Sequence, residues 1–555
     1  MMNRYNGFLN IYKESGWTSM DVCAKLRGIL GMRKIGHAGT LDPMAEGVLP
    51  VALGRATKDV DRIGDGTKTY VAGMLLGRTT DTQDTTGTIC SEYSGVLPDA
   101  ETVKKAALSF LGRYAQLTPM YSARKVAGKK LYEYARAGKE VERKRKEVEI
   151  LELCVEEVNL PHVRLRVTCT KGTYIRTLCA DIGEKLGCGA CMESLLRTRV
   201  GDFTLASALK LSEVEALRGQ HAVDDALVIE APTAVALGKF DGTHIGHQRL
   251  FRELLRTAQA EHLRSMVLIL DPSAKRIEDR EARKAALYAM GIDYVIELKL
   301  SEELMHMSAE DFLQKMLIGR FSMHAIVAGR DVTFGCGKRG NAAFLTEHAK
   351  EDGFSVHLID KVETALPGKQ GALVVSSSRV REELGAGNME NVAMLLGHPW
   401  RLSGRVVHGR HLGGPVMGFP TMNLAVPEGM VLPPYGVYAV KLTFLESGSQ
   451  KKTQGKAPVL HAFSGTYYGI ANLGTKPTVT ESGEQPKVNL ETYAFSFAGD
   501  AYGQEISVEL LHFIRPERKF DNLEELKEQL LEKDIAAAKK YLAVQPGASQ
   551  SLQSS

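Results

Sequence analysis

Three successive stretches of this 555-residue chain carry three different patterns of strand and helix, and this change of pattern restricts the fold more than any other feature. A chain of this length is expected to form three to four domains of about 150 residues each. Residues 1–228 mix short strand-like runs, such as TYVAGMLLG and VRLRVTCT, with helical stretches such as TVKKAALSFLG. The mixture predicts an α+β domain.

The second stretch, residues 229–398, begins with a strand, a glycine-rich turn and a helix. The apolar run at 233–237 leads into GKFDGTHIGH, and the helix that follows has one apolar stripe, formed by Leu250, Phe251, Leu254, Leu255 and Ala258. Later apolar runs alternate with helical segments. This order predicts an α/β, Rossmann-like domain with a parallel sheet.

The third stretch, residues 399–543, is rich in strand-like runs separated by Gly and Pro, including GVYAVKLTF, TYYGIANLG and EISVELLHFI. Such runs predict a small closed antiparallel β-barrel. A C-terminal helix is expected to follow, opened by Asn522 and Glu525 at capping-box spacing. The tail, residues 544–555, is predicted to be disordered.

Composition narrows the class of protein. With 44% hydrophobic and 25% charged residues, the chain is typical of folded globular proteins. No apolar run approaches the length of about 18 residues that a membrane span needs, and the first residues lack the pattern of an export signal. Eight scattered cysteines favour reduced thiols in a cytoplasm. The pair Cys188 and Cys191 leaves a zinc or redox role open beside that of ordinary thiols.

Positive charge is concentrated in one segment. The net charge is only +4, yet residues 113–146 contain eleven basic and three acidic residues. Such a surplus is expected for a surface that binds a phosphate backbone, because neutralised phosphates release condensed counterions. A solvated charged hairpin explains the charge equally well.

The peptide GHAGTLDPMAEGVLP, residues 36–50, places Asp42 in a glycine-containing loop stiffened by Pro43 and Pro50. An isolated Asp-Pro of this kind is usually a turn. Three further motifs follow in order: KTYVAGMLLGRTTDTQDTTG from residue 68, PMYSARKVAGKKLYEYARAG from residue 119 and KGTYIRTLCADIGEKLGCGA from residue 171. With these four motifs, the chain resembles the TruB family of tRNA pseudouridine synthases over residues 5–215.

The resemblance implies roles for individual residues. Asp42 would be the catalytic carboxylate, Tyr70 the ring that stacks on the everted target base, and Arg176 the cation that keeps Asp42 charged in a dehydrated pocket. A core aromatic and a structural ion pair are the plainer alternatives for Tyr70 and Arg176. The implied partner is the T-arm of tRNA, with no cofactor for the reaction. The implied RNA-binding residues are His37, Lys68, Arg124, Lys125, Lys129, Lys130 and Tyr174.

The second stretch contains the H-x-G-H pattern of nucleotidyltransferases, at His244 and His247. The later motifs GRDVTFG, from residue 329, and SSSRVR, from residue 376, complete a resemblance to the bifunctional riboflavin kinase/FAD synthetase of the RibF type, whose first module adenylylates FMN. Ser273 replaces a histidine that the family usually has, which removes one expected ligand contact. The implied nucleotide-binding residues are Gly238, Phe240, Asp241, Gly242, His244, Gly246, His247, Asp331, Ser376, Ser377 and Arg381.

The third stretch resembles the flavokinase domain of the same family. The peptide GFPTMN begins at Gly418 and also contains Pro420, both implied in nucleotide binding. The resemblance makes Thr421 and Asn423 oxygen ligands of Mg²⁺ bridging ATP phosphates, and Glu491 the general base for the ribityl hydroxyl.

The leading hypothesis from the sequence is a cytoplasmic fusion of a tRNA pseudouridine-55 synthase with a riboflavin kinase and an FMN adenylyltransferase. Its substrates would be tRNA, ATP, riboflavin and FMN, with no DNA or membrane partner. The expected domains are residues 1–228, 229–398 and 399–543, in that order, and then the tail. Two alternatives stay open: the flavin part is only a kinase or a decayed binding scaffold, or the first domain is mainly an RNA-folding chaperone.

Overall fold

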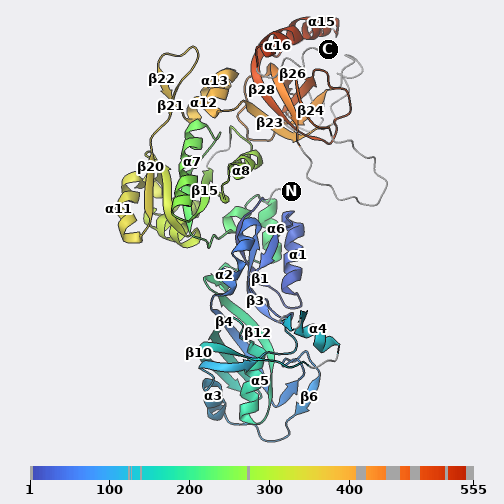
Figure 1. Ribbon diagram of the computed structural model, residues 1–555, viewed down its shortest axis with the longest axis vertical. Coiled ribbons are helices and arrows are strands. Elements are labelled where there is room, and N and C mark those ends of the chain that lie inside the picture. The colour runs from blue at the N-terminus through green and yellow to red at the C-terminus, as the bar shows by residue number, and fades with distance from the viewer. Residues whose placement is uncertain are drawn as a thin grey trace. The chain divides into compact units, whose positions relative to one another are not determined.

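The computed structural model describes residues 4–122, 125–126, 128–137, 141–271, 275–407, 421–445, 463–475, 488–518, 520 and 523–545. They form two compact units (Figure 1). The first unit lies within Asn3–Pro232 and includes Arg320–Ser322, and the second comprises the rest of the described chain from Thr233 onward.

The first unit is built on a nine-stranded sheet. Its main path runs β1 (Gly7–Lys13), β3 (Glu46–Leu53), β12 (Ala190–Val200), β4 (Lys68–Leu76), β11 (His162–Cys169), β10 (Arg145–Asn159) and β7 (Gly112–Leu117), with β2 (Ile35–His37) on β3 and β13 (Phe203–Thr204) on β12. Only β3 and β12 pair in parallel within this sheet. Its longer helices are α1 (Ser19–Leu30), α3 (Ala100–Leu108), α5 (Ile175–Leu186) and α6 (Leu211–Gly219). The predicted α+β architecture is confirmed.

Strand β4 shows why this sequence forms a half-buried strand. Alternate residues from Lys68 to Leu76 are buried, so Tyr70, Ala72 and Met74 face the core. Helix α5 packs against the same core through Leu178 and Ile182. The buried face of β4 therefore belongs to the core, and its first residue, Lys68, is polar.

Smaller elements complete the first unit: η1 (Gly54–Lys58), α2 (Val60–Gly64), β5 (Arg78–Thr80), β6 (Ile89–Glu92), β8 (Lys125–Val126), β9 (Lys129–Lys130), α4 (Leu131–Arg136), η2 (Leu205–Ser207) and η3 (Val223–Ala226). Strands β8 and β9 form a short hairpin within the basic segment.

The second unit begins with a five-stranded parallel sheet, as predicted. Its strand order is β16 (Tyr294–Lys299), β15 (Arg264–Asp271), β14 (Thr233–Gly238), β17 (Met323–Gly329) and β20 (Ser355–Ile359). The chain order reverses at β14, and such a switch point opens a ligand crevice beyond the carboxyl ends of the strands. Helix α7 (Ile245–Ala260) packs its predicted apolar stripe against this sheet.

The other elements of this part are α8 (Arg280–Ala289), α9 (Glu302–His306), α10 (Ala309–Asp311), the π-helix η4 (Phe312–Arg320), β18 (Thr333–Phe334), η5 (Cys336–Lys338), β19 (Gly340–Asn341), α11 (Ala342–Asp352), β21 (Glu363–Ala365), β22 (Ala372–Val374), α12 (Ser377–Gly385) and α13 (Met389–Leu396).

A six-stranded antiparallel barrel follows in the same unit. Its strand order is β23 (Trp400–Arg405), β28 (Glu505–Pro516), β25 (Gly436–Phe444), β26 (Thr466–Thr475), β27 (Val488–Ala494) and β24 (Met422–Ala425). A bridge between Val407 and Asn423 nearly closes it, as predicted. The C-terminal helical region consists of α15 (Leu523–Glu528), the π-helix η6 (Gln529–Asp534) and α16 (Ile535–Leu542). The predicted cap at Asn522 lies outside the described residues.

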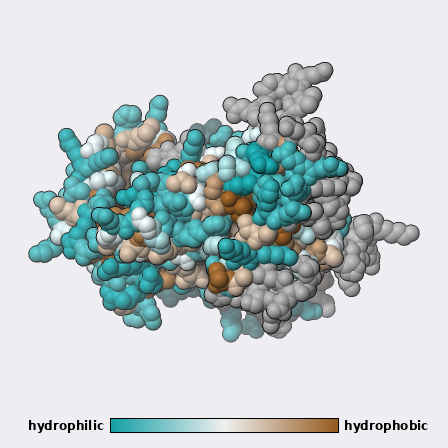
Figure 2. Space-filling view, turned by 90° about the horizontal axis from the view of Figure 1, so that it is seen from above, coloured by the Kyte–Doolittle hydropathy of each residue, from teal (hydrophilic) through white to brown (hydrophobic). Residues whose placement is uncertain are grey.

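Hydrophilic residues cover most of the described surface in the view of Figure 2, and apolar residues form small separate patches on it. Scattered apolar residues of this kind are ordinary on a folded domain. Within the described ranges, none of the helices has the length and apolar character to cross a membrane.

Candidate active sites

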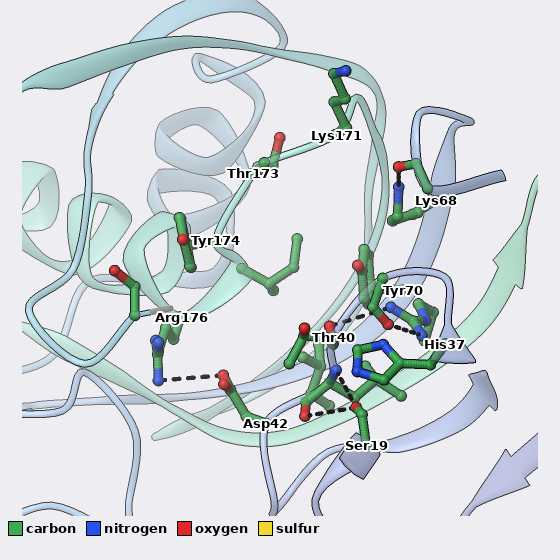
Figure 3. A pocket seen from close by; sticks show the side chains of 18 of the residues that line it. Ser19, His37, Thr40, Asp42, Lys68, Tyr70, Lys171, Thr173, Tyr174 and Arg176 are labelled. Atoms are coloured by element: carbon green, nitrogen blue, oxygen red, sulfur yellow. Dashed lines mark hydrogen bonds and ion pairs between the residues drawn. The ribbon is translucent and has the colours of Figure 1, made fainter. Parts of the chain in front are cut away.

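The first unit contains a cavity of about 750 Å³ (Figure 3). Its wall combines the loop between β2 and β3, the start of β4 and the segment that enters α5. The cavity brings together six of the predicted site residues, His37, Asp42, Lys68, Tyr70, Tyr174 and Arg176. Tyr121 and Ser122, from the motif that begins at residue 119, line it as well, so residues from all four sequence motifs converge on one pocket.

Asp42 and Arg176 face each other across this cavity. An Asp42 carboxylate oxygen lies 3.2 Å from Nη1 of Arg176, whose side chain is buried, whereas that of Asp42 is 34% exposed. Burial raises the pKa of the Asp42 carboxyl, and the Arg176 charge opposes that shift. The predicted pair is therefore formed, and its cation favours the ionised acid against the effect of burial.

A second carboxylate, Asp84, was missed by the sequence reasoning. It is buried 3.8 Å from Nη1 of Arg176, and its charge adds to the rise in the pKa of Asp42. The hydroxyls of Thr82 and Thr86 both donate to its Oδ1. A threonine two residues before and another two residues after an Asp was the available signal, because such hydroxyls hold a carboxylate in a local turn.

The loop that carries Asp42 is fixed by polar groups from two other elements. The amide of Leu41 donates to Oγ of Ser19 over 2.9 Å, at the start of α1. The ammonium of Lys13, fully buried in β1, donates to the carbonyls of Pro43 (3.1 Å) and Ala45 (2.6 Å). Burial lowers the pKa of Lys13 to about 8. The backbone directly after Asp42 is therefore held by a cation that the sequence analysis did not identify.

Tyr70 and Lys68 line the cavity from the first residues of β4. Tyr70 is buried in the core, as the plainer alternative predicts, and it also lines the cavity, while its role of stacking on a base stays a prediction. Burial raises the pKa of its phenol, which keeps the hydroxyl protonated. The Lys68 ammonium donates to the carbonyls of Gly64 (2.7 Å) and Gly66 (2.9 Å), and burial lowers its pKa to about 8. Lys68 thus holds the cavity wall itself.

Of the remaining predicted RNA-binding residues, His37 and Tyr174 line the cavity, and the backbone of Lys125, Lys129 and Lys130 forms the basic hairpin of β8 and β9. Burial lowers the pKa of His37. Its Nδ1 has no hydrogen-bond partner in the described part of the chain. Lys129 is exposed in β9. The side chains of Lys125 and Lys130, and the whole of Arg124, lie outside what the structure describes.

The nucleotidyltransferase-like site begins at the carboxyl end of β14. His244 caps the N-terminus of α7, its Nδ1 accepting from the amide of His247 over 3.3 Å. The two imidazoles stack with their centroids 3.6 Å apart, and Phe240 packs edge-on against His247. Gly242 has a φ of +77°, and a side chain there would also press on Ile277. Stacked neutral imidazoles at a helix N-terminus can donate hydrogen bonds to phosphate oxygens.

The motif from residue 376 packs against the same turn. Arg381 lies 2.5 Å from the carboxylate of Asp241, and the Ser377 hydroxyl donates to the Asp241 carbonyl over 2.8 Å. Ser376 caps α12. Asp331 follows β17 at the same edge of the sheet, largely exposed and 3.1 Å from Nζ of Lys361. Gly238 and Gly246 flank the turn. The altered position Ser273 lies outside the described residues.

Burial lowers the pKa of His244 to about 4, which predicts a pH-dependent stability of the second unit. An unfolded histidine titrates near pH 6.5, so between about pH 6.5 and 4 the unfolded chain binds more protons than the folded one. The contribution of His244 to the free energy of unfolding is therefore full above this window. It falls by up to about 3 kcal/mol as the pH drops through the window.

Urea unfolding followed by Trp400 fluorescence, in a Trp17→Phe background, would measure this effect. Trp400 reports on this unit because its indole donates to the carbonyl of Ile277. His244→Asn, which keeps a cap acceptor, should make the dependence between pH 6.5 and 4 less steep, and the lowered pKa of His247 accounts for part of what remains. The matched variant at exposed His306, H306N, should leave it unchanged. Equal slopes in wild type and H244N would contradict the assignment.

The barrel brings the three predicted kinase residues together. Asn423 in β24 pairs directly with Glu491 in β27. The Thr421 hydroxyl donates to Oε1 of Glu491 over 2.7 Å, and buried Asn423 accepts from Nδ2 of Asn489 over 2.6 Å. Hydroxyl, amide and carboxylate oxygens are the donors that Mg²⁺ prefers, so this set fits the ion. Gly418 and Pro420 lie outside the described residues.

Within the described ranges, no group of three or more His, Cys, Asp and Glu side chains is placed to hold a metal ion. Cys188 and Cys191 are buried free thiols, and burial raises the pKa of both.

An α+β unit whose cavity pairs aspartate with a buried arginine is followed by an α/β fold and a barrel, and family matches to these three parts define a pseudouridylate synthase joined to flavin nucleotide enzymes. Residues 27–175 match the TruB family pseudouridylate synthase N-terminal domain, and residues 176–231 match the tRNA pseudouridylate synthase B C-terminal domain. Residues 228–370 match FAD synthetase and residues 396–542 match riboflavin kinase. The chain belongs to the TruB family and carries FAD synthetase and riboflavin kinase domains.

Relatives support the first assignment. The chain is 48% identical to tRNA pseudouridine synthase B of Alkaliphilus oremlandii over 223 residues, which cover 40% of this chain and 73% of that protein. It is 50% identical to tRNA pseudouridine synthase B of Syntrophomonas wolfei over 214 residues, 38% of this chain and 71% of the relative.

Among solved structures, the chain is similar to a macrolide-efflux protein from Streptococcus pneumoniae, with a TM-score of 0.45 and 27% identity over 56% of this chain and 95% of that one.

Proposed function

We propose that the first unit converts a T-loop uridine of tRNA, at position 55, into pseudouridine without a cofactor, with Asp42 as the catalytic residue. The observation that carries this proposal is the Asp42 carboxylate 3.2 Å from Arg176 in a cavity of about 750 Å³. A pocket of this volume is large enough for an everted nucleotide. Family membership gives the reaction, and the tRNA substrate of the relatives gives the RNA.

In this isomerisation the bond between C1′ and N1 breaks, the uracil turns, and a bond between C1′ and C5 forms. C5 loses a proton and N1 gains one, so the product has the same composition as the substrate. Ionised Asp42 acts at the sugar or base, and Arg176 stabilises its charge. Tyr70 gives the everted base an aromatic surface, which replaces stacking of about 1–3 kcal/mol. His37, Tyr174 and the basic hairpin bind the RNA around the cavity.

The second unit, in this proposal, makes FMN from riboflavin and ATP, and FAD and diphosphate from FMN and ATP. His244, His247 and Arg381 bind the phosphates during adenylyl transfer, with the neighbouring glycines, serines and Asp241 shaping the turn. In the barrel, Glu491 takes the proton of the ribityl hydroxyl. Thr421 and Asn423 would hold Mg²⁺, which neutralises charge on the ATP phosphates.

The same proposal covers the organisation of the chain. The domains are residues 1–228, 229–398 and 399–543, and the protein acts in the cytoplasm. All eight cysteines are free thiols in the structure, the state expected in a reducing compartment.

One experiment tests both halves. The full chain is given unmodified tRNA labelled with tritium at uridine C5, and in parallel riboflavin, ATP and Mg²⁺. Tritium release is expected from tRNA with the T-loop uridine and not from tRNA with cytidine at that position. Chromatography should show both FMN and FAD. Release from both RNAs alike would contradict the proposed site of modification, and FMN without FAD would support the kinase-only alternative.

A further inference from the structure

Arg197 is a buried cation that the roles above leave unexplained. It lies in the middle of β12, opposite Tyr70 of β4 on one side and Gly47 of β3 on the other. Its side chain is 0% exposed, yet it lines the cavity that contains Asp42. In the described part of the chain, no carboxylate forms an ion pair with it.

Besides its side-chain interaction with Tyr70, the Arg197 guanidinium donates to backbone carbonyls of the loop that carries Asp42 and of strand β3. Nη2 donates to the carbonyl of Gly39 over 3.0 Å, Nη1 to that of Thr40 over 3.4 Å and Nε to that of Val48 over 2.7 Å. The strand itself is tightly seated, because a side chain at Gly47 would come within 2.2 Å of the Arg197 carbonyl. One side chain therefore ties β12 to both ends of the segment that contains Asp42.

The charge of Arg197 reaches the cavity as well. It lowers the pKa of His37, Lys13 and Lys68, and its interaction with Tyr70 opposes the rise in the phenol's pKa. Burying a cation without a counterion is costly, and a neutral donor would satisfy a carbonyl at lower cost. The retained charge therefore points to a contribution of Arg197 to the cavity beyond filling the core.

We propose that Arg197 is a positioning residue for the pseudouridine synthase reaction. It fixes the backbone before Asp42, while Lys13 fixes the backbone after it, so that the carboxylate is held facing Arg176. Three nitrogens of the planar, charged guanidinium each donate to a different carbonyl. The role therefore requires both the shape and the charge of an arginine side chain. This inference rests on the proposed function of the cavity.

Variants Arg197→Lys and Arg197→Met test it, with Arg199→Lys and Arg199→Met as matched controls. Arg199 lies two residues further along the same strand, with its side chain 55% exposed. Single-turnover pseudouridine formation should fall about 100-fold in R197M, because a displacement of about 1 Å at a reacting group costs that much. The fall should be smaller in R197K, and the Kd for tRNA should stay within about twofold for both.

Hydrogen exchange of the peptide covering residues 38–45 tests positioning without any activity. Exchange should quicken in both R197 variants and stay unchanged in both R199 variants. R197K guards against failure of R197M to fold, and a thermal unfolding curve confirms that each is folded. Unchanged rate and unchanged exchange in folded R197K and R197M would overturn the inference. A wild type inactive on tRNA, with quickened exchange in the variants, would sink the proposed function and leave the positioning role standing.

Discussion

Asp42→Asn should lower pseudouridine formation by at least about 10³-fold, the scale of loss seen when a residue that reacts directly with substrate is removed. Asn has the shape of Asp. The side chains of Ser19 and Lys13 contact only backbone atoms of the loop, so these contacts are kept in the variant. What it removes is the negative charge, the property that the proposed chemistry needs. Tritium release under single-turnover conditions would measure the loss.

Binding and stability separate this effect from a folding defect. The Kd for tRNA should be unchanged or lower in D42N, because a carboxylate repels the phosphate backbone. The free energy of unfolding should change by no more than about 1 kcal/mol, since the carboxylate is one-third exposed and Arg176 keeps Asp84 nearby. Asp202→Asn, at an aspartate 88% exposed, is the control. A D42N enzyme with wild-type rate would refute the assignment of Asp42.

Local patterns predicted the elements well. The alternation in TYVAGMLLG became β4, with Tyr70 on its buried side, and the stripe from Leu250 to Ala258 became the buried face of α7. These features depend on neighbours within a few residues, which a pattern of period 2 or 3.6 captures. Motif resemblance added the pairing of Asp42 with Arg176, although 133 positions separate them in the sequence.

The supporting residues escaped prediction because their partners are distant and are mostly backbone atoms. Lys13 and Arg197 resemble ordinary strand residues, and only the folded chain brings carbonyls of the Asp42 loop to their donors. Lys68 was expected to contact RNA, yet its ammonium is engaged by Gly64 and Gly66, where the chain turns into β4. Carbonyl acceptors are present at every residue, so sequence gives no sign of which cation will bind them.

In the barrel, the contact between predicted residues depends on the strand register, which the sequence motifs did not predict. The motif around Thr421 and the motif around Glu491 were assigned separately by resemblance, and their contact depends on Asn423 lying opposite Glu491. A slip of one residue would turn the carboxylate to the other face of the sheet. The register is set by the whole pairing of β24 with β27 and not by either motif.

Glu491→Gln should lower FMN formation from riboflavin by about 10²–10⁴-fold, the usual contribution of a general base. Gln retains an oxygen that can accept from the Thr421 hydroxyl, so the barrel should keep its geometry while losing the base. Conversion of supplied FMN to FAD should continue at the wild-type rate, because His244 and His247, at the start of α7, and Arg381, in α12, lie outside the barrel strands that carry Glu491. Chromatography of both reactions in one preparation therefore contains its own folding control.

Glu509→Gln is the matched change elsewhere in the barrel. Glu509 lies in β28 and pairs with Lys441 of β25 over 3.1 Å, so its loss removes a barrel carboxylate without touching β24 or β27. It should leave both reactions unchanged. Equal loss of FMN formation in E491Q and E509Q would mean that the barrel responds to charge in general and would remove the case for Glu491 as base. Loss confined to E491Q, and confined to the kinase reaction, requires a proton acceptor at that residue.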